Sequence, residues 1–158
     1  PESGHVTIAA RDVREYRQAD VRRMFALAGQ EAHLFNSTIR ANLLLARPRA
    51  TDDELHDALR KARLDEWVES LPDGLDTLVG EEGGRLSGGQ RRRLTVARAV
   101  LSDAPVLVRD GPTAHLDPPT AEALIDDVLD AADGRAVLLI THRPEGLARM
   151  DEIVSLGA

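Results

Sequence analysis

Two short apolar runs alternate with stretches of helical periodicity, and this alternation constrains the fold more than any other feature of the sequence. Residues 106–108 and 136–140 are rich in Val, Leu and Ile and are bounded by turn residues, which is typical of parallel strands buried on both faces. Parallel neighbours need a long crossover, usually a helix. The sequence therefore predicts an α/β fold built from βαβ units.

Start and stop signals place three helices. The first is predicted at residues 51–70, where Thr51 and Glu54 form a capping-box pattern and Pro72 follows. The second is predicted at residues 89–102 and the third at residues 118–132, with prolines at its start and Gly134 after its end. The other expected elements are strands at residues 6–9, 25–28 and 152–156 and helices at residues 19–24 and 143–150.

Composition excludes several classes of protein. Hydrophobic residues make up 42% and charged residues 30%, which favours a soluble globular domain over a disordered chain. The apolar runs fall far below the ~18 residues that cross a bilayer, and no export signal is visible, so we expect a cytoplasmic location. There is no cysteine, and a net charge of −7 argues against a nucleic-acid partner.

A serine and two glycines stand at the predicted start of the second helix. Ser87 offers a hydroxyl, and Gly88 and Gly89 leave backbone N–H groups unobstructed at the positive end of a helix. Such a cradle suits a terminal phosphate. The alternative is an ordinary helix cap with a glycine-rich entry.

Further polar residues follow predicted strands. Asp110 ends the run at 106–108 and is suited to hold Mg²⁺ directly or through water, and His142 follows the run at 136–140. Gln30 follows an apolar run near the N-terminus. We expect all three at one edge of the sheet. Taken singly, each has an ordinary alternative, as a turn aspartate, a histidine at the sheet edge or a polar loop residue.

In order and spacing, these elements resemble the nucleotide-binding domain of ATP-binding-cassette proteins from about residue 3 to residue 157. Gln30 resembles the Q-loop glutamine, residues 86–90 (LSGGQ) the signature, and residues 106–110 the Walker B strand. Asp117 resembles the D-loop aspartate and His142 the H-switch. The resemblance implies a P-loop NTPase-like core formed by residues 1–34 and 102–158, with a helical signature subdomain at residues 35–101.

Finer likeness points to exporters. Residues 35–43 are similar to the exporter segment that meets a transmembrane domain, and residues 77–83 are similar to the exporter segment before the signature. Residues 103–105, 113–117 and 141–147 resemble CydC/CydD-type exporters of cysteine and glutathione. The resemblance thus implies a transmembrane domain as partner and a location on the cytoplasmic face of the inner or plasma membrane.

In this family two cassettes pair head to tail, so the resemblance divides the site residues between two ATP molecules. Ser87, Gly88, Gly89 and Gln90 would contact ATP held by the partner cassette, and Asp117 would sense that partner. On the other ATP, Asp110 and Gln30 would hold Mg²⁺, while His142 and Gln30 would serve catalysis.

Three departures from the family pattern bear on activity. No GxxxxGK[ST] loop occurs in this sequence, whose single lysine is Lys61, so we expect the carboxyl-terminal part of a longer transporter with uncovered apolar core surface and poor stability alone. Arg109 replaces an apolar strand residue, and burying a guanidinium is costly unless a carboxylate pairs with it. Gly111 stands where the family has a catalytic glutamate, and losing a general base costs ~10²–10⁴ in rate.

These departures leave three functions open. The first is the ATP-driven cassette of an exporter, in which this chain donates its signature to a partner site but does not hydrolyse ATP alone. The second is a soluble cassette ATPase of DNA repair or translation. The third is a non-catalytic regulatory or interaction module, which Gly111 favours.

Overall fold

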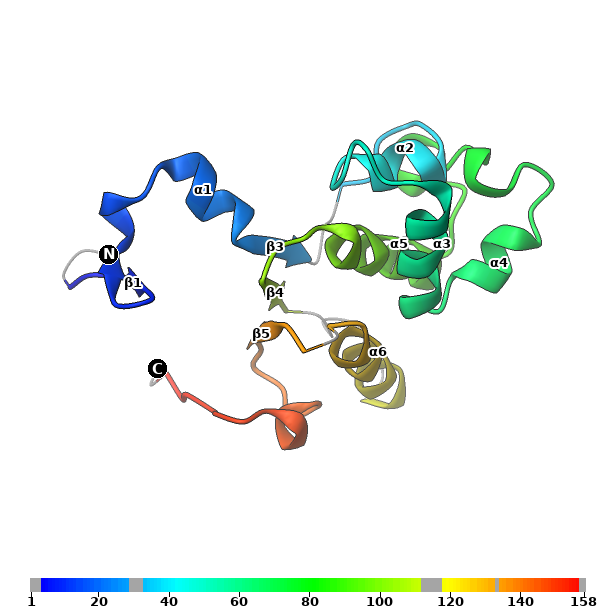
Figure 1. The fold of residues 1–158 in the computed structure, drawn as a ribbon. Coiled ribbons are helices and arrows are strands. Elements are labelled where there is room, and N and C mark those ends of the chain that lie inside the picture. The colour runs from blue at the N-terminus through cyan, green and yellow to red at the C-terminus, as the bar shows by residue number, and fades with distance from the viewer. Residues whose placement is uncertain (1–3, 29–32, 112–117, 133, 157–158) are drawn as a thin grey trace.

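A three-stranded parallel sheet lies at the centre of the computed structural model, which describes residues 4–28, 33–111, 118–132 and 134–156 (Figure 1). The strands β3 (Phe25–Ala28), β4 (Val106–Asp110) and β5 (Ala136–Ile140) occur in the order β3-β4-β5. Val106 pairs with Phe25 on one side and with Ala136 on the other. The sheet and its helices confirm the predicted α/β class.

The two long helices α5 (Gly88–Leu101) and α6 (Pro118–Ala131) lie on one side of this sheet (Figure 1). Both were expected within one residue of these bounds. Small side chains fill the space between helices and sheet, and this cluster consists of Ala26, Ala99, Ala104, Leu107 and Ala132. Because alanines allow close approach, the helices sit tightly on the strands.

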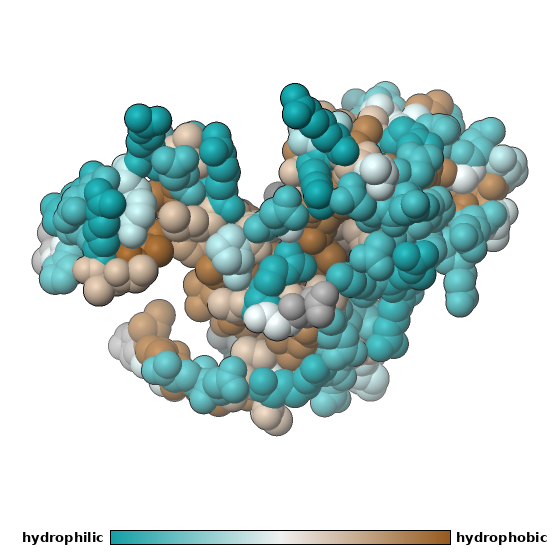
Figure 2. All heavy atoms as spheres, in the orientation of Figure 1, coloured by the Kyte–Doolittle hydropathy of each residue, from teal (hydrophilic) through white to brown (hydrophobic). Residues whose placement is uncertain are grey.

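The opposite face of the sheet is exposed, which corrects the expectation of strands buried on both faces. The β5 residues alternate between exposed and half-buried, and Leu27 on β3 is 66% exposed. Figure 2 shows hydrophobic side chains around the opening between the N-terminal arm and the C-terminal segment. No element among the described residues packs on this face, so its apolar side chains remain in contact with solvent.

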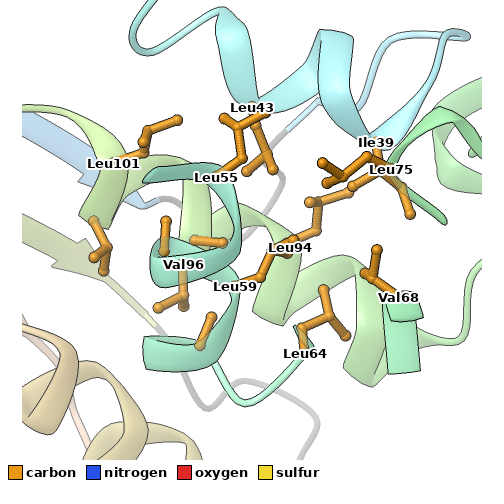
Figure 3. Close-up of a cluster of buried hydrophobic side chains, with 14 of the residues drawn as sticks. Ile39, Leu43, Leu55, Leu59, Leu64, Val68, Leu75, Leu94, Val96 and Leu101 are labelled. Carbon is orange, nitrogen blue, oxygen red and sulfur yellow. The ribbon is translucent and has the colours of Figure 1, made fainter. Parts of the chain in front are cut away.

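A layer of shorter helices covers the other side of α5. It comprises α2 (Ile39–Leu44), α3 (Asp52–Lys61), α4 (Asp65–Glu69) and the 3₁₀ turns η2 (Gly74–Asp76) and η3 (Glu81–Gly83). Their leucines and valines interlock around Leu59 and Leu94, which are both fully buried (Figure 3). Val128 and Ala131 of α6 join the same cluster. The boundaries of a separate subdomain at residues 35–101 stay a prediction.

The helix predicted at residues 51–70 is two helices. After α3 the chain turns at Arg63, whose φ is 51°. The Arg63 N–H donates to the Arg60 carbonyl and the Leu64 N–H to the Leu59 carbonyl, each at 2.9 Å. This pair of bonds is a Schellman motif, which ends a helix and returns an apolar residue to the core. The turn buries Leu64 against Leu59, and this burial favours two helices over one.

The two ends of the chain are less regular than expected. The N-terminal segment forms the hairpin β1 (Thr7–Ile8) and β2 (Arg11–Asp12), the turn η1 (Val13–Glu15) and the predicted helix α1 (Gln18–Arg23). Of the helix expected at 143–150, only the turn η4 (Leu147–Arg149) forms. No strand forms at 152–156, where no described strand lies alongside to pair with it. No helix of the described residues is long and apolar enough to span a membrane.

Candidate functional site

The predicted phosphate cradle lies at the first turn of α5. Ser87 is the N-cap: its Oγ accepts a hydrogen bond from the Gln90 N–H at 3.2 Å, and its own N–H donates to Gln90 Oε1 at 2.8 Å. This reciprocal pair is a capping box, which satisfies two helix-end donors. The Ser87 hydroxyl still has its proton to donate, and the Gln90 amide keeps its NH₂ group. Each can therefore reach an outside acceptor without disturbing the cap.

Among the described residues, none packs closely enough against Gly88 or Gly89 to require glycine there. A Cβ at Gly88 would meet nothing within 4 Å, and one at Gly89 would meet only Ser87 Oγ, at 3.9 Å. Neither has a positive φ. Glycine in a helix costs roughly 0.5–1 kcal/mol relative to alanine, and here nothing in the described fold offsets that cost. The pair leaves an exposed surface of backbone amides that an anion can approach closely.

Charge around this turn favours an anion. The helix N-terminus carries a partial positive charge, the first turn of α5 has no acidic residue, and three arginines follow at 91–93. The rest of the helix is held rigidly, because its middle and C-terminal residues are almost all buried. The residues present therefore fit a phosphate group, and the fold presents them on a fixed element.

The carboxyl ends of β4 and β5 bring two other predicted residues to one edge. Asp110 ends β4 opposite Ile140, and the Gly111 N–H donates to the Ile140 carbonyl at 2.9 Å. His142 follows β5 two residues later and is exposed. Thr141 Oγ1 accepts from the Arg143 N–H at 3.0 Å and fixes the turn between them. Gln30 and Asp117 lie outside the described residues, and the catalytic and metal roles of all four stay predictions.

The two departures in this strand have clear structural settings. Arg109 is 3% exposed in the central strand, and burial followed by repulsion from Arg92 lowers its pKa to about 10. Gly111 is buried with a φ of 51°, a left-handed conformation that disfavours a residue with a side chain. The backbone therefore favours glycine at the position where the family pattern has glutamate.

Two other features of the described residues lie away from these strand ends. An open cleft of about 660 Å³ runs between α3 and the C-terminal end of α5, and no predicted site residue lines it. His56, Asp65 and Glu69 have potential metal-ligand atoms within 4.8 Å of one another. His56 Nδ1 is 2.6 Å from Asp65, whose other oxygen is 3.8 Å from the Arg60 guanidinium. Because Asp65 already has these partners, we assign it a structural role in joining α3 to α4.

The comparisons with known proteins decide the family. The family described as ABC transporter matches residues 1–114. The chain belongs to the ABC transporter family. The ATP-dependent lipid A-core flippase of Vibrio cholerae is 41% identical over 154 residues, or 97% of this chain. The glutathione/L-cysteine transport protein CydC of Escherichia coli is 36% identical over 98% of it. The chain spans about a quarter of the length of these relatives.

A solved structure agrees with this family. The structure of a bacterial Atm1-family ABC exporter with ATP bound superimposes with a TM-score of 0.79 over 89% of this chain and 25% of that chain, at 32% identity. The resemblance to an exporter-type ABC cassette and the predicted class of fold are thereby confirmed.

The structure also reveals residues that motif reading of an ABC transporter chain overlooks. Arg93, on the exposed side of α5, pairs at 3.8 Å with Asp127, which is buried on α6. Arg135 donates to the carbonyls of Val100 and Ser102 at the C-terminal end of α5 and to two carbonyls at the end of α6. One signal was available for Asp127, since it lies beside the apolar stripe of its helix.

Proposed function

We propose that this chain is part of an exporter's ATP-binding cassette and that its signature closes over ATP held by a second cassette. In this proposal the Ser87 hydroxyl and the backbone N–H groups of Gly88 and Gly89 donate to the terminal phosphate. The Gln90 amide approaches the same anion from the next position. Preorganised donors of this kind need no rearrangement when the negative charge arrives.

One observation carries the proposal: the two glycines at the exposed helix entrance serve no need of the chain's own described fold. Open space around Gly88 and the near absence of neighbours at Gly89 mean that alanine would fit at both positions. Alanine would also stabilise the helix. Glycine is therefore explained best by a group outside this chain that approaches the backbone closely.

The strand edge serves the other ATP in this proposal. Mg²⁺ bound at Asp110 and Gln30 would neutralise phosphate charge there, while His142 would contact the terminal phosphate from the neighbouring strand. Gly111 supplies no carboxylate to take a proton from water. This half of the cassette therefore supports nucleotide binding with slow hydrolysis. The division into a core and a helical signature subdomain at residues 35–101 belongs to the same proposal.

The relatives support a membrane partner and two candidate cargoes. Because the relatives include a flippase and a glutathione/L-cysteine transport protein, we infer a transmembrane domain as partner, with the cassette on the cytoplasmic face of the membrane. Cysteine or glutathione is the cargo we favour, on the likeness of residues 103–105, 113–117 and 141–147 to CydC/CydD-type exporters. Lipid export is the alternative, and transport by the assembled protein distinguishes the two.

Photolabelling with 8-azido-ATP tests the signature proposal. The chain is mixed with a second cassette that carries its own phosphate-binding loop, and labelling of the pair is compared with labelling of each alone. Ser87→Asn and Ser87→Asp form a matched pair, because both residues are good N-caps but only aspartate adds a negative charge facing the phosphate. We expect labelling of the pair to survive Ser87→Asn largely intact and to be lost with Ser87→Asp.

Two controls make the outcome decisive. Ser70→Asp places the same charge on an exposed serine after α4 and should leave labelling unchanged. Circular dichroism verifies that all three variants keep their helices. Equal labelling with Ser87→Asp and Ser87→Asn contradicts the proposal. Absence of labelling with the unaltered chain favours the non-catalytic module instead.

A further inference from the structure

A network of arginines and aspartates surrounds α6, and its significance for the signature depends on the function proposed above. We call it the α6 network; it consists of Arg63, Arg93, Asp126, Asp127, Asp130 and Arg149. Asp127 lies at its centre and is only 3% exposed. Its two carboxylate oxygens lie 2.7 Å from Arg63 Nε and 3.8 Å from Arg93 Nη2. A buried carboxylate thus joins α6 to two other elements.

The helical layer is held at this point by its backbone as well as its side chains. Arg63 occupies the left-handed position of the turn that ends α3, where glycine is the usual residue. Its carbonyl accepts a hydrogen bond from Arg93 Nη1 at 3.2 Å. Arg93 lies one helical turn after Gln90 on α5. The first turns of the signature helix, the α3–α4 turn and α6 are therefore connected through three side chains.

The other side of α6 is tied to the segment that follows His142. Arg149 donates to Asp126 and to Asp130, each at 2.8 Å, and Asp130 also lies 3.7 Å from Arg63. A Cβ placed on Gly146 would lie 2.4 Å from Ile125 Cγ2, so this loop approaches α6 more closely than any other residue type allows. Asp130 thus contacts both the helical layer and the segment after His142.

We propose that the α6 network is a positioning device that fixes the signature turn relative to the His142 segment, with Asp127 as its central positioning residue. Removing one partner of a buried ion pair leaves a charge without compensation. The side chains of Arg63 and Arg93 are 62% and 44% exposed, whereas Asp127 is 3% exposed, so contact with the Asp127 carboxylate, and not burial, holds their guanidinium groups beside α6. The signature helix and α6 therefore move as one unit, and a displacement of the His142 segment reaches the signature through Asp130 and Arg63.

Distance measurements on the chain test this proposal directly. Because the sequence has no cysteine, spin labels can be placed uniquely at Arg91→Cys on α5 and Ala123→Cys on α6, both exposed positions. Pulsed electron–electron double resonance then gives the distribution of distances between the two spin labels, and hence between the two helices. Asp127→Asn should broaden the distribution and displace its mean, because Arg63 and Arg93 then repel each other without a carboxylate between them. Arg63→Gln should act in the same direction.

Controls separate positioning from folding. Asp57→Asn removes a comparable carboxylate from a surface pair on α3 and should leave the distribution unchanged. Circular dichroism establishes that each variant is folded; if Asp127→Asn is not, Arg63→Gln carries the test, since the Arg63 side chain is mostly exposed. An unaltered distribution in a folded Asp127→Asn or Arg63→Gln variant overturns the proposal.

A second readout connects the network to the signature. Photolabelling of the pair of cassettes should fall about five- to tenfold with Asp127→Asn, the size of a typical coupling between sites, and should not change with Asp57→Asn. If even the unaltered chain shows no labelling, the proposed function fails, and the distance measurement, which needs neither nucleotide nor partner, still decides whether the network exists. A full level of labelling with a folded Asp127→Asn variant contradicts the positioning role.

Discussion

The helical layer and the sheet of this chain are stabilised in opposite ways. Between the helical layer and α5, long side chains such as Leu59 and Leu94 are fully buried. Between the sheet and its helices, the packed cluster consists mainly of alanines, and large strand residues such as Leu27 and Leu138 face solvent on the other side of the sheet. The cluster beside the signature helix is thus buried by residues of this chain, whereas one apolar face of the sheet is exposed to solvent.

This contrast agrees with the division of labour proposed for the cassette. A signature that must meet an outside ligand accurately benefits from a rigid, locally stabilised support. A sheet with one exposed apolar face needs a further layer to remove that surface from water. If stability lies mainly in the helical layer, a substitution there should destabilise the chain more than a matched substitution on the exposed face of the sheet.

Truncating one leucine in each region should have very different effects. Leu59→Ala removes a fully buried side chain of α3 and should lower the free energy of unfolding by about 2–5 kcal/mol. Leu27→Ala removes the same atoms from the exposed sheet face and should change it by at most about 0.5 kcal/mol. Urea unfolding measures both. A similar decrease in the free energy of unfolding for the two variants would contradict the contrast between the regions.

Removing the buried charge of Arg109 should stabilise the sheet. Arg109→Leu places an apolar side chain at a site that is 3% exposed and removes the cost of keeping a guanidinium out of water there. Burial lowers the Arg109 pKa to about 10, so the folded state disfavours the charged form. The cost of that charge is fully present below pH 10 and decreases as the pH rises through this value.

Thermal unfolding of the two proteins between pH 8 and 11 checks both statements. The variant should melt at a higher temperature at pH 8, and the difference should narrow as the pH passes 10. A variant that melts lower than the unaltered chain at every pH would indicate that Arg109 stabilises the sheet.

Two capping boxes of the same design distinguish support from ligand contact. Thr51 with Glu54 caps α3, and Ser87 with Gln90 caps α5. Thr51→Ala and Ser87→Ala should each destabilise the chain by about 1 kcal/mol. Only Ser87→Ala should also weaken nucleotide labelling, because the proposed function places only the Ser87 hydroxyl at a phosphate. Melting temperatures and photolabelling of both variants provide the measurement, and equal losses of labelling would argue against a special role for Ser87.

Local signals in the sequence predicted most of the regular structure. The capping box at Thr51, the glycine pair at the start of α5 and the prolines at the start of α6 each marked the beginning of a helix within one residue. The strands β3 and β5 were predicted with their bounds because short apolar runs between turn residues are typical of buried strands. The fold class followed from their alternation.

Non-local packing explains what the sequence did not reveal. Nothing near Arg63 distinguishes a helix end from a helix interior, and the turn exists because Leu64 gains burial against Leu59. The exposed side of the sheet could not be deduced from Leu138 or Leu27, which look like core residues. At the site, motifs located Ser87, Asp110 and His142, but the two arginines that pair with Asp127 lie far from it in sequence, one in the α3–α4 turn and one on α5.

Substituting Gly88 separates a nucleotide-binding role of this helix entrance from a role in folding. Gly88→Ala should raise the stability of the chain by roughly 0.5–1 kcal/mol, because a Cβ meets nothing there, and should reduce photolabelling of the cassette pair to background. Gly74→Ala is the matched control, since its φ of +48° makes alanine strained; it should lower stability and leave labelling of the folded protein intact. A Gly88→Ala variant that is more stable and labels as strongly as the unaltered chain would contradict the claim that this helix entrance is shaped for a nucleotide.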